Sequence, residues 1–111
     1  MPESSDVSTA RSIYEFQGSE RQAETIAMLM RTGLPWMKFS YVSGAPLSEL
    51  GLNGEARTQL VNGKNVTLDI TYTPQAYAAT PEQGAQLSIR ARGDPIEVRA
   101  TGRLIKAILD Q

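Results

Sequence analysis

Residues 66–73 alternate strictly between apolar and polar side chains. The apolar members are Val66, Leu68, Ile70 and Tyr72, and threonines and an aspartate lie between them. Because successive side chains of a β-strand point to opposite faces, this pattern predicts a strand with one buried and one solvated face. Such a strand needs partners for its backbone hydrogen-bonding groups, so the chain must form a sheet.

The dipeptide Asn62-Gly63 precedes this strand and is the strongest turn signal in the chain. It favours a two-residue type I′ hairpin, because both central residues of that turn need a positive φ. The hairpin would join residues 57–61 to residues 64–73. Residues 55–61 also fit a short helix that ends before the glycine, and the sequence leaves this alternative open.

Three other segments alternate in the same way, and they cover residues 12–16, 86–92 and 96–101. Residues 93–95 (Gly-Asp-Pro) predict a turn, so we expect a second hairpin there. Residues 34–43 carry apolar side chains on both faces. This is typical of a central strand or of a strand that is covered on both sides.

Two segments have helical periodicity. Ser19 begins a capping-box pattern, and the apolar residues after it recur at intervals of three and four. This predicts a helix near 19–32, with Gly33 ending it in a left-handed conformation. A short amphipathic helix is expected near 103–110, after a break of the last strand at Gly102.

These elements predict an α+β fold with a largely antiparallel sheet of about five to six strands, open or barrel-like, that carries both helices. The length of 111 residues suits a single domain, which we expect at residues 11–111. Residues 1–10 are polar and lack the apolar stretch of a signal peptide, so a disordered tail is expected there. Residues 74–86 show no pattern and predict a long loop, of a kind that is often mobile or functional.

The composition excludes several kinds of site. The chain has no cysteine and no histidine, which excludes thiolate and imidazole ligands and the usual catalytic triads. Neither a P-loop nor a dinucleotide-binding glycine motif occurs. We therefore expect no catalytic, cofactor-binding or metal-binding residues. Without an export signal or a run of about 20 apolar residues, the chain is expected to be cytoplasmic and to bind no membrane.

The leading functional hypothesis is a small, non-enzymatic interaction or regulatory module that binds a protein or peptide, alone or as a homodimer. An exposed sheet edge would let a partner strand add to the sheet. Trp36 is of a type enriched at partner surfaces, although in a small domain such a residue more commonly belongs to the core. The candidate partner-binding residues are Trp36, Tyr72, Tyr77 and Ile89.

An alternative hypothesis is a regulator that binds nucleic acid. The candidate residues are Arg90, Arg92 and Arg99. They alternate along the two strands expected around residues 93–95, so all three would share one sheet face, and Tyr72 and Tyr77 would add stacking surfaces. The formal net charge of −1 supplies no general attraction for nucleic acid, and the alternative is that Glu97 and Asp69 simply pair with these arginines across strands.

Residues 61–70 (VNGKNVTLDI) and 87–95 (LSIRARGDP) give the order hairpin, irregular loop, hairpin. With a helix before residues 35–42 and an apolar helix at the end, about half of the chain resembles the stringent starvation protein B adaptors. The resemblance implies an Sm-like β fold and the delivery of tagged proteins to a protease, which makes an adaptor a second alternative. It rests on alternation and turns, so it transfers no site residues.

Overall fold

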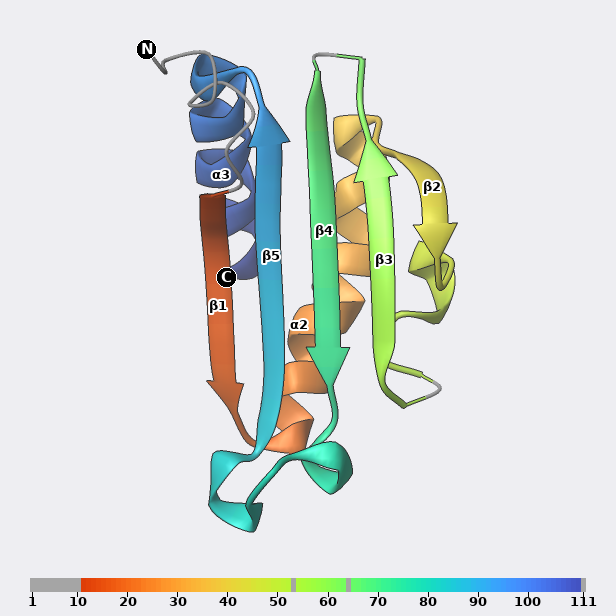
Figure 1. Cartoon of the computed structure of the whole chain (residues 1–111), viewed down its shortest axis with the longest axis vertical. Coiled ribbons are helices and arrows are strands. Elements are labelled where there is room, and N and C mark those ends of the chain that lie inside the picture. The colour runs from red at the N-terminus through yellow and green to blue at the C-terminus, as the bar shows by residue number, and fades with distance from the viewer. Residues whose placement is uncertain (1–10, 53, 64, 111) are drawn as a thin grey trace, which may run out of the picture.

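The computed structural model describes residues 11–52, 54–63 and 65–110. Five strands form one antiparallel sheet, and two α-helices lie together on one of its faces (Figure 1). The strands are β1(Arg11–Gly18), β2(Ser40–Gly44), β3(Ala56–Val61), β4(Val66–Thr73) and β5(Ala85–Gly93), and the helices are α2(Glu20–Gly33) and α3(Pro95–Leu109). This confirms the α+β class and the antiparallel sheet.

The sheet is open, with the spatial order β1-β5-β4-β3-β2. The first and last strands of the chain are neighbours, yet β1 and β2 at the two edges do not meet. The barrel-like alternative is therefore wrong, and so is the Sm-like fold that the resemblance implied. The tail predicted at residues 1–10 lies outside the described residues.

The hydrophobic core lies between the sheet and the two helices. The inward side chains of β4 and β5 are almost completely buried, namely Val66, Leu68, Ile70, Tyr72, Ala85, Leu87, Ile89 and Ala91. They pack against the buried sides of α2 and α3. The side chains between them are polar and face away from the helices, as the alternation predicts for a sheet with one solvated face.

The start of α2 is as predicted and is tied to the end of β4. Ser19 Oγ accepts a hydrogen bond from the backbone N–H of Gln22, and Gln22 Oε1 accepts one from the backbone N–H of Ser19. Glu20, in the first turn, accepts one from the hydroxyl of Tyr72 and one of 2.7 Å from the backbone N–H of Gln75. One carboxylate therefore joins segments more than fifty residues apart.

The phenol of Tyr72 yields a stability prediction. Burial, and then the hydrogen bond to Glu20, raise the pKa of Tyr72 well above its usual range. The folded state thus holds this proton more tightly than the unfolded chain does. The contribution of Tyr72 to the free energy of unfolding should therefore be fully present below pH of about 10 and be lost as the pH rises above it.

We expect Tyr72→Phe to lower the free energy of unfolding by about 1–2 kcal/mol at neutral pH and to make the alkaline decline shallower. Some decline should remain, because burial also raises the pKa of Tyr14. Guanidinium chloride unfolding on both sides of pH 10 measures both effects, with Tyr77→Phe as the exposed control. If the free energy of unfolding of Tyr72→Phe fell at alkaline pH as steeply as that of the wild type, the raised pKa of Tyr72 would not be a cause of the decline.

The end of α2 differs from the prediction. Gly33 is right-handed (φ −89°), and the chain continues into the 3₁₀ helix η1(Leu34–Met37) before Lys38 takes the left-handed conformation (φ 63°). The glycine is explained by packing instead, since a Cβ at Gly33 would lie 3.0 Å from Cγ2 of Ile108 on α3. Gly33 is therefore the last residue of α2 without the predicted left-handed conformation, and its lack of a side chain lets α2 and α3 approach closely.

Strand β2 is shorter and more peripheral than the sequence indicated. The two-sided apolar pattern favoured a central or covered strand over residues 34–43, but β2 covers only Ser40–Gly44 and lies at an edge of the sheet. Its side chains are exposed throughout, including those of Tyr41 and Val42. The prediction fails because the first four apolar-rich residues form η1 and not a strand.

The hairpin between β3 and β4 is confirmed, and the helical alternative for residues 55–61 is wrong. The turn is not the predicted two-residue type I′, however. The backbone N–H of Asn62 donates to Val66 O over 3.1 Å, and the Val66 N–H donates back to Asn62 Oδ1 over 3.2 Å. A positive φ occurs at Asn65 (φ 61°) and not at the Asn62-Gly63 pair.

Residues 96–101 are the largest departure, because they form the first half of α3 and not a strand. The Asp94 side chain caps the helix by accepting a hydrogen bond from the backbone N–H of Glu97, and the proline at the first helical position suits that place. The inward residues recur at helical spacing, namely Val98, Thr101, Ile105 and Leu109. Gly102 lies inside α3, where a Cβ would come 3.3 Å from Ile13 of β1.

Candidate functional site

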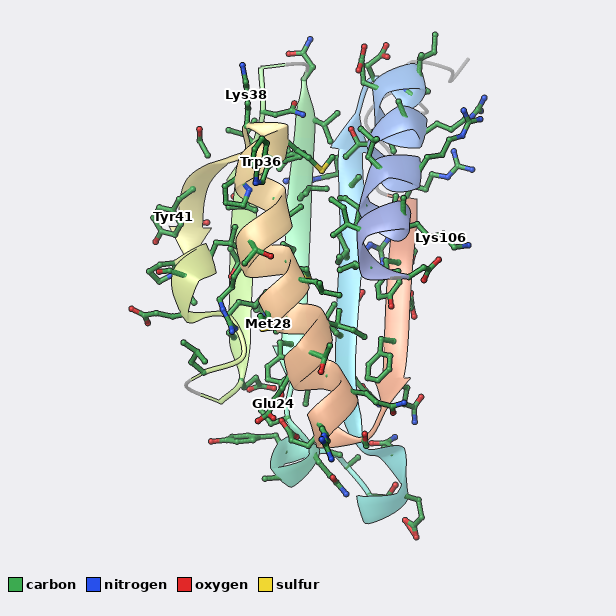
Figure 2. The ribbon with its side chains drawn as sticks, turned by 180° about the vertical axis from the view of Figure 1, so that it is seen from behind. Glu24, Met28, Trp36, Lys38, Tyr41 and Lys106 are labelled. Atoms are coloured by element: carbon green, nitrogen blue, oxygen red, sulfur yellow. The ribbon has the colours of Figure 1, made fainter. Side chains whose placement is uncertain are left out.

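A hollow of about 540 Å³ lies on the helix side of the molecule, between η1, the β3–β4 turn and α3. It is lined by Trp36, Met37 and Lys38 from one side, by Asn62 and Gly63 from the turn, and by Glu97, Ala100, Thr101 and Leu104 from α3. We call it the Trp36 groove. Figure 2 shows Trp36 and Lys38 where α2 ends, beside the half of the molecule that α3 covers.

Local geometry turns Trp36 outward. In a 3₁₀ helix, residues three apart lie on the same side. Leu34 is 1% exposed and Met37 is partly buried against the core, so these two fix the inward side of η1. Trp36 lies between them in sequence and is 86% exposed. The alternative in which Trp36 belongs to the core is therefore wrong.

Helix α3 carries a second apolar stripe besides its buried one. Ile96, Ala100 and Leu104 recur every four residues, which places them on one side of the helix. Ile96 is 75% exposed and Leu104 is 57% exposed, and Ala100 and Leu104 form a wall of the Trp36 groove. Nothing in the described part of this chain covers the stripe.

Two opposite charges flank the groove. Lys38 lies at the η1 side, and Glu97 lies across the hollow in the first turn of α3. Within the residues that the structure describes, no ion pair engages either side chain. The groove therefore combines an apolar wall with one positive and one negative rim.

The opposite face of the sheet carries a polar ladder across four strands. Ser43 Oγ donates to Gln59 Oε1 over 3.3 Å, and Gln59 Nε2 donates to Asp69 Oδ1 over 3.1 Å. Arg92 Nε donates to Asp69 Oδ2 over 3.2 Å in an ion pair whose side chains are 44% and 40% exposed. A solvated pair of this kind adds little stability.

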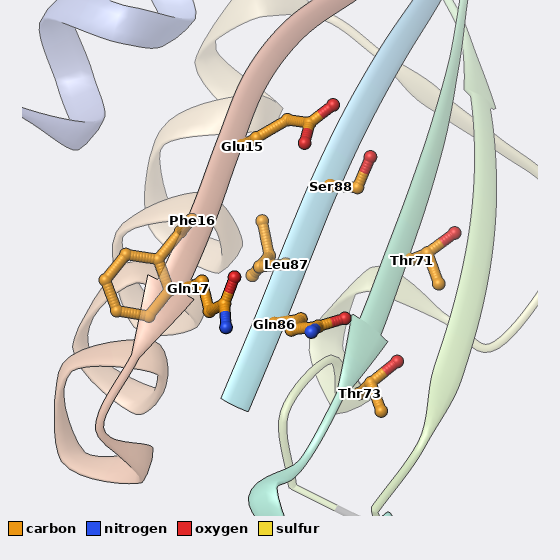
Figure 3. Close-up of a pocket in the computed structure, with 8 residues that line it drawn as sticks. All are labelled: Glu15, Phe16, Gln17, Thr71, Thr73, Gln86, Leu87 and Ser88. Atoms are coloured by element: carbon orange, nitrogen blue, oxygen red, sulfur yellow. The ribbon is translucent and has the colours of Figure 1, made fainter. Parts of the chain in front are cut away.

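A second hollow of about 410 Å³ lies on this polar face, over β1, β5 and β4 (Figure 3). Glu15, Ser88 and Thr71 form one row across it, as the strand register requires, while Phe16 is turned away from the row. The lining offers neutral hydrogen-bonding groups and one carboxylate. Among the described residues, no group of three acidic side chains is placed to hold a metal ion.

The four partner-binding candidates do not form one site. Tyr72 and Ile89 are 1% and 0% exposed, because strand parity places both on the helix-covered face. Strand β5 lies between β1 and β4, so Ile89 does not lie on an exposed sheet edge to which a partner strand could add. Tyr77 is exposed, but it lies after the last residue of β4. The β3–β4 turn, which borders Trp36, lies before the first residue of β4, so the two aromatic residues are at opposite ends of that strand.

The three arginines are divided between two layers. Arg90 and Arg92 lie on the polar face of β5, whereas Arg99 lies on α3 on the other side of the sheet. Tyr72 faces the core, so it cannot stack a base beside the arginines. The prediction that the three arginines share one sheet face is therefore wrong. Nucleic-acid binding stays a prediction that rests on Arg90 and Arg92. Of these two, Arg92 is paired with Asp69.

Comparison with protein-family models, curated proteins and solved structures finds no match for this chain. In the described ranges, no helix is both long enough and apolar enough to cross a membrane. The Trp36 groove must therefore be interpreted from its own chemistry. Sequence reasoning missed Ile96 and Leu104, although their eight-residue separation, with Ala100 midway, was a usable helical signal after the Asp94-Pro95 cap.

Proposed function

We propose that this chain is a non-enzymatic protein-interaction module that binds its partner through the Trp36 groove. The observation that carries the proposal is the 86% exposure of Trp36 at the rim of an apolar hollow. Covering an indole of this exposure would contribute about 4 kcal/mol of hydrophobic free energy. Tryptophan is also among the residues most enriched at the energetic centres of protein interfaces.

The proposal places the contact on the helix side and not on a sheet edge. The edge strands are β1 and β2, and each has a register shift, between Ser12 and Tyr14 in β1 and between Tyr41 and Ser43 in β2. Such irregularities twist an edge and hinder the addition of a foreign strand.

The test is affinity capture from lysate with the wild type, Trp36→Ala and Tyr77→Ala. Tyr77 is the matched control, because it is an exposed aromatic residue away from the groove. We expect a protein that the wild type and Tyr77→Ala retain and that Trp36→Ala binds at least about tenfold more weakly. A partner held equally by all three would contradict the proposal.

A nuclease-treated lysate run in parallel distinguishes this function from the nucleic-acid alternative. The proposal expects recovery of the protein partner to survive nuclease treatment. Recovery that depends on intact nucleic acid, and that falls with Arg90→Ala and with added salt, would favour the polar sheet face instead.

A further inference from the structure

The Trp36 groove has a side chain that projects from its rim. Trp36 stands out into solvent at the rim and does not fill the hollow next to it. A volume of about 540 Å³ is within the range of pockets that hold drug-sized ligands, so it can accommodate an indole. When a two-fold axis relates two copies through this surface, the Trp36 side chain of each copy faces the hollow of the other. This is the geometry of an isologous dimer.

The wall of the hollow on the α3 side is apolar. Ala100 and Leu104 line it, opposite Trp36 and Met37. Leu104 is 57% exposed, so an indole from a second copy would cover apolar surface there besides burying its own. Insertion of Trp36 therefore removes apolar surface from water on both copies.

The charges at the rim agree with this arrangement. Lys38 and Glu97 lie on opposite sides of the groove, so a two-fold rotation places each lysine near the glutamate of the other copy. A surface with one charge of each sign across its centre is complementary to itself. The net charge of −1 per chain opposes association only weakly.

We infer that the occupant of the Trp36 groove is a second copy of this chain, in a two-fold dimer with reciprocal insertion of Trp36 and crossed Lys38–Glu97 pairs. The inference names the partner of the interaction module proposed above and therefore rests on that function.

Sedimentation velocity over about 1 µM to about 1 mM, the range in which contacts of modest size dissociate, tests the dimer. We expect a reversible monomer–dimer equilibrium in the wild type and a dissociation constant raised at least about 30-fold by Trp36→Ala. Met28→Ala is the matched control, because Met28 is an exposed apolar residue midway along α2 and outside the groove (Figure 2). It should leave the dissociation constant unchanged.

A charge exchange tests the orientation. Lys38→Glu and Glu97→Lys should each weaken self-association about tenfold, because each creates like charges across both crossed pairs. An equimolar mixture of the two variants should form a heterodimer with a dissociation constant close to that of the wild type, because opposite charges then meet at both contacts. Circular dichroism checks the fold of each variant, and Glu97→Gln replaces Glu97→Lys in the single-variant comparison if α3 is disturbed.

The outcomes separate the inference from the proposed function. A wild-type chain that stays monomeric throughout the series overturns the dimer, while Trp36-dependent capture of a different protein would still support the interaction module. A dimer that Trp36→Ala does not weaken overturns the assignment of the groove to a second copy. A mixture of the two charge variants that stays as weak as either variant alone overturns the crossed arrangement.

Discussion

Replacing Gly93 with alanine is expected to lower the free energy of unfolding by about 3 kcal/mol. Gly93 has a φ of +134° where β5 ends, and it pairs with Val66 at the start of β4. A Cβ at this position would lie 1.8 Å from the backbone oxygen of Asn65. Because that neighbour is backbone, the strand end or the turn must shift, and the pairing between β4 and β5 is weakened at that end.

Gly63→Ala is the matched control in the same region. No atom lies within 4 Å of a Cβ built at Gly63, and its φ is not positive. We expect a change smaller than about 0.5 kcal/mol. Denaturant unfolding of both variants measures the difference. A larger loss at Gly63 than at Gly93 would mean that the turn needs the type I′ conformation after all, in contradiction to the turn described above.

Ile89→Ala is expected to destabilise the chain by about 3 kcal/mol, through lost burial and the cavity left behind. Ile89 is 0% exposed in the middle of β5, opposite Ile70 of β4 and Tyr14 of β1. Arg90→Ala changes the next residue of the same strand, whose side chain is exposed, and should shift the free energy by less than about 0.5 kcal/mol.

Thermal and denaturant unfolding of the two variants decide between a core and a surface position. If Ile89→Ala were as stable as Arg90→Ala, the Ile89 side chain would lie at the surface, and the face of β5 assigned to the core would be wrong. A core position also explains why Ile89 cannot serve as a peptide-binding residue on an edge.

Elements with strong local signals were predictable from the sequence. The capping box at Ser19 located the start of α2, and the alternation through residues 66–73 located β4 with its buried face. Residues 96–101 misled because Ile96, Val98 and Ala100 fit a period of two, whereas in α3 only Val98 of the three is buried. The contact of Gly102 with Ile13 of β1 is tertiary, so no local pattern could reveal that this glycine belongs inside a helix.

The candidate site was predictable only in part. The residue type of Trp36 marked it as a candidate. Its exposure follows from the 3₁₀ helix η1, whereas the apolar pattern of residues 34–43 predicted a strand there. The groove also needs the β3–β4 turn and α3, which are separated from Trp36 by about 25 and 60 residues in the sequence. Only the packing of α3 across the sheet brings these three segments together.

Trp36 is the only tryptophan of the chain, so its fluorescence reports on the groove without a label. The direct measurement is its emission spectrum and acrylamide quenching across the concentration series used for sedimentation. In dilute protein we expect long-wavelength emission and quenching close to that of a free indole. At concentrations where the chain sediments as a dimer, the emission should shift to shorter wavelength and the quenching should fall. Emission and quenching that stay constant while the sedimenting mass doubles would contradict burial of Trp36 at the contact.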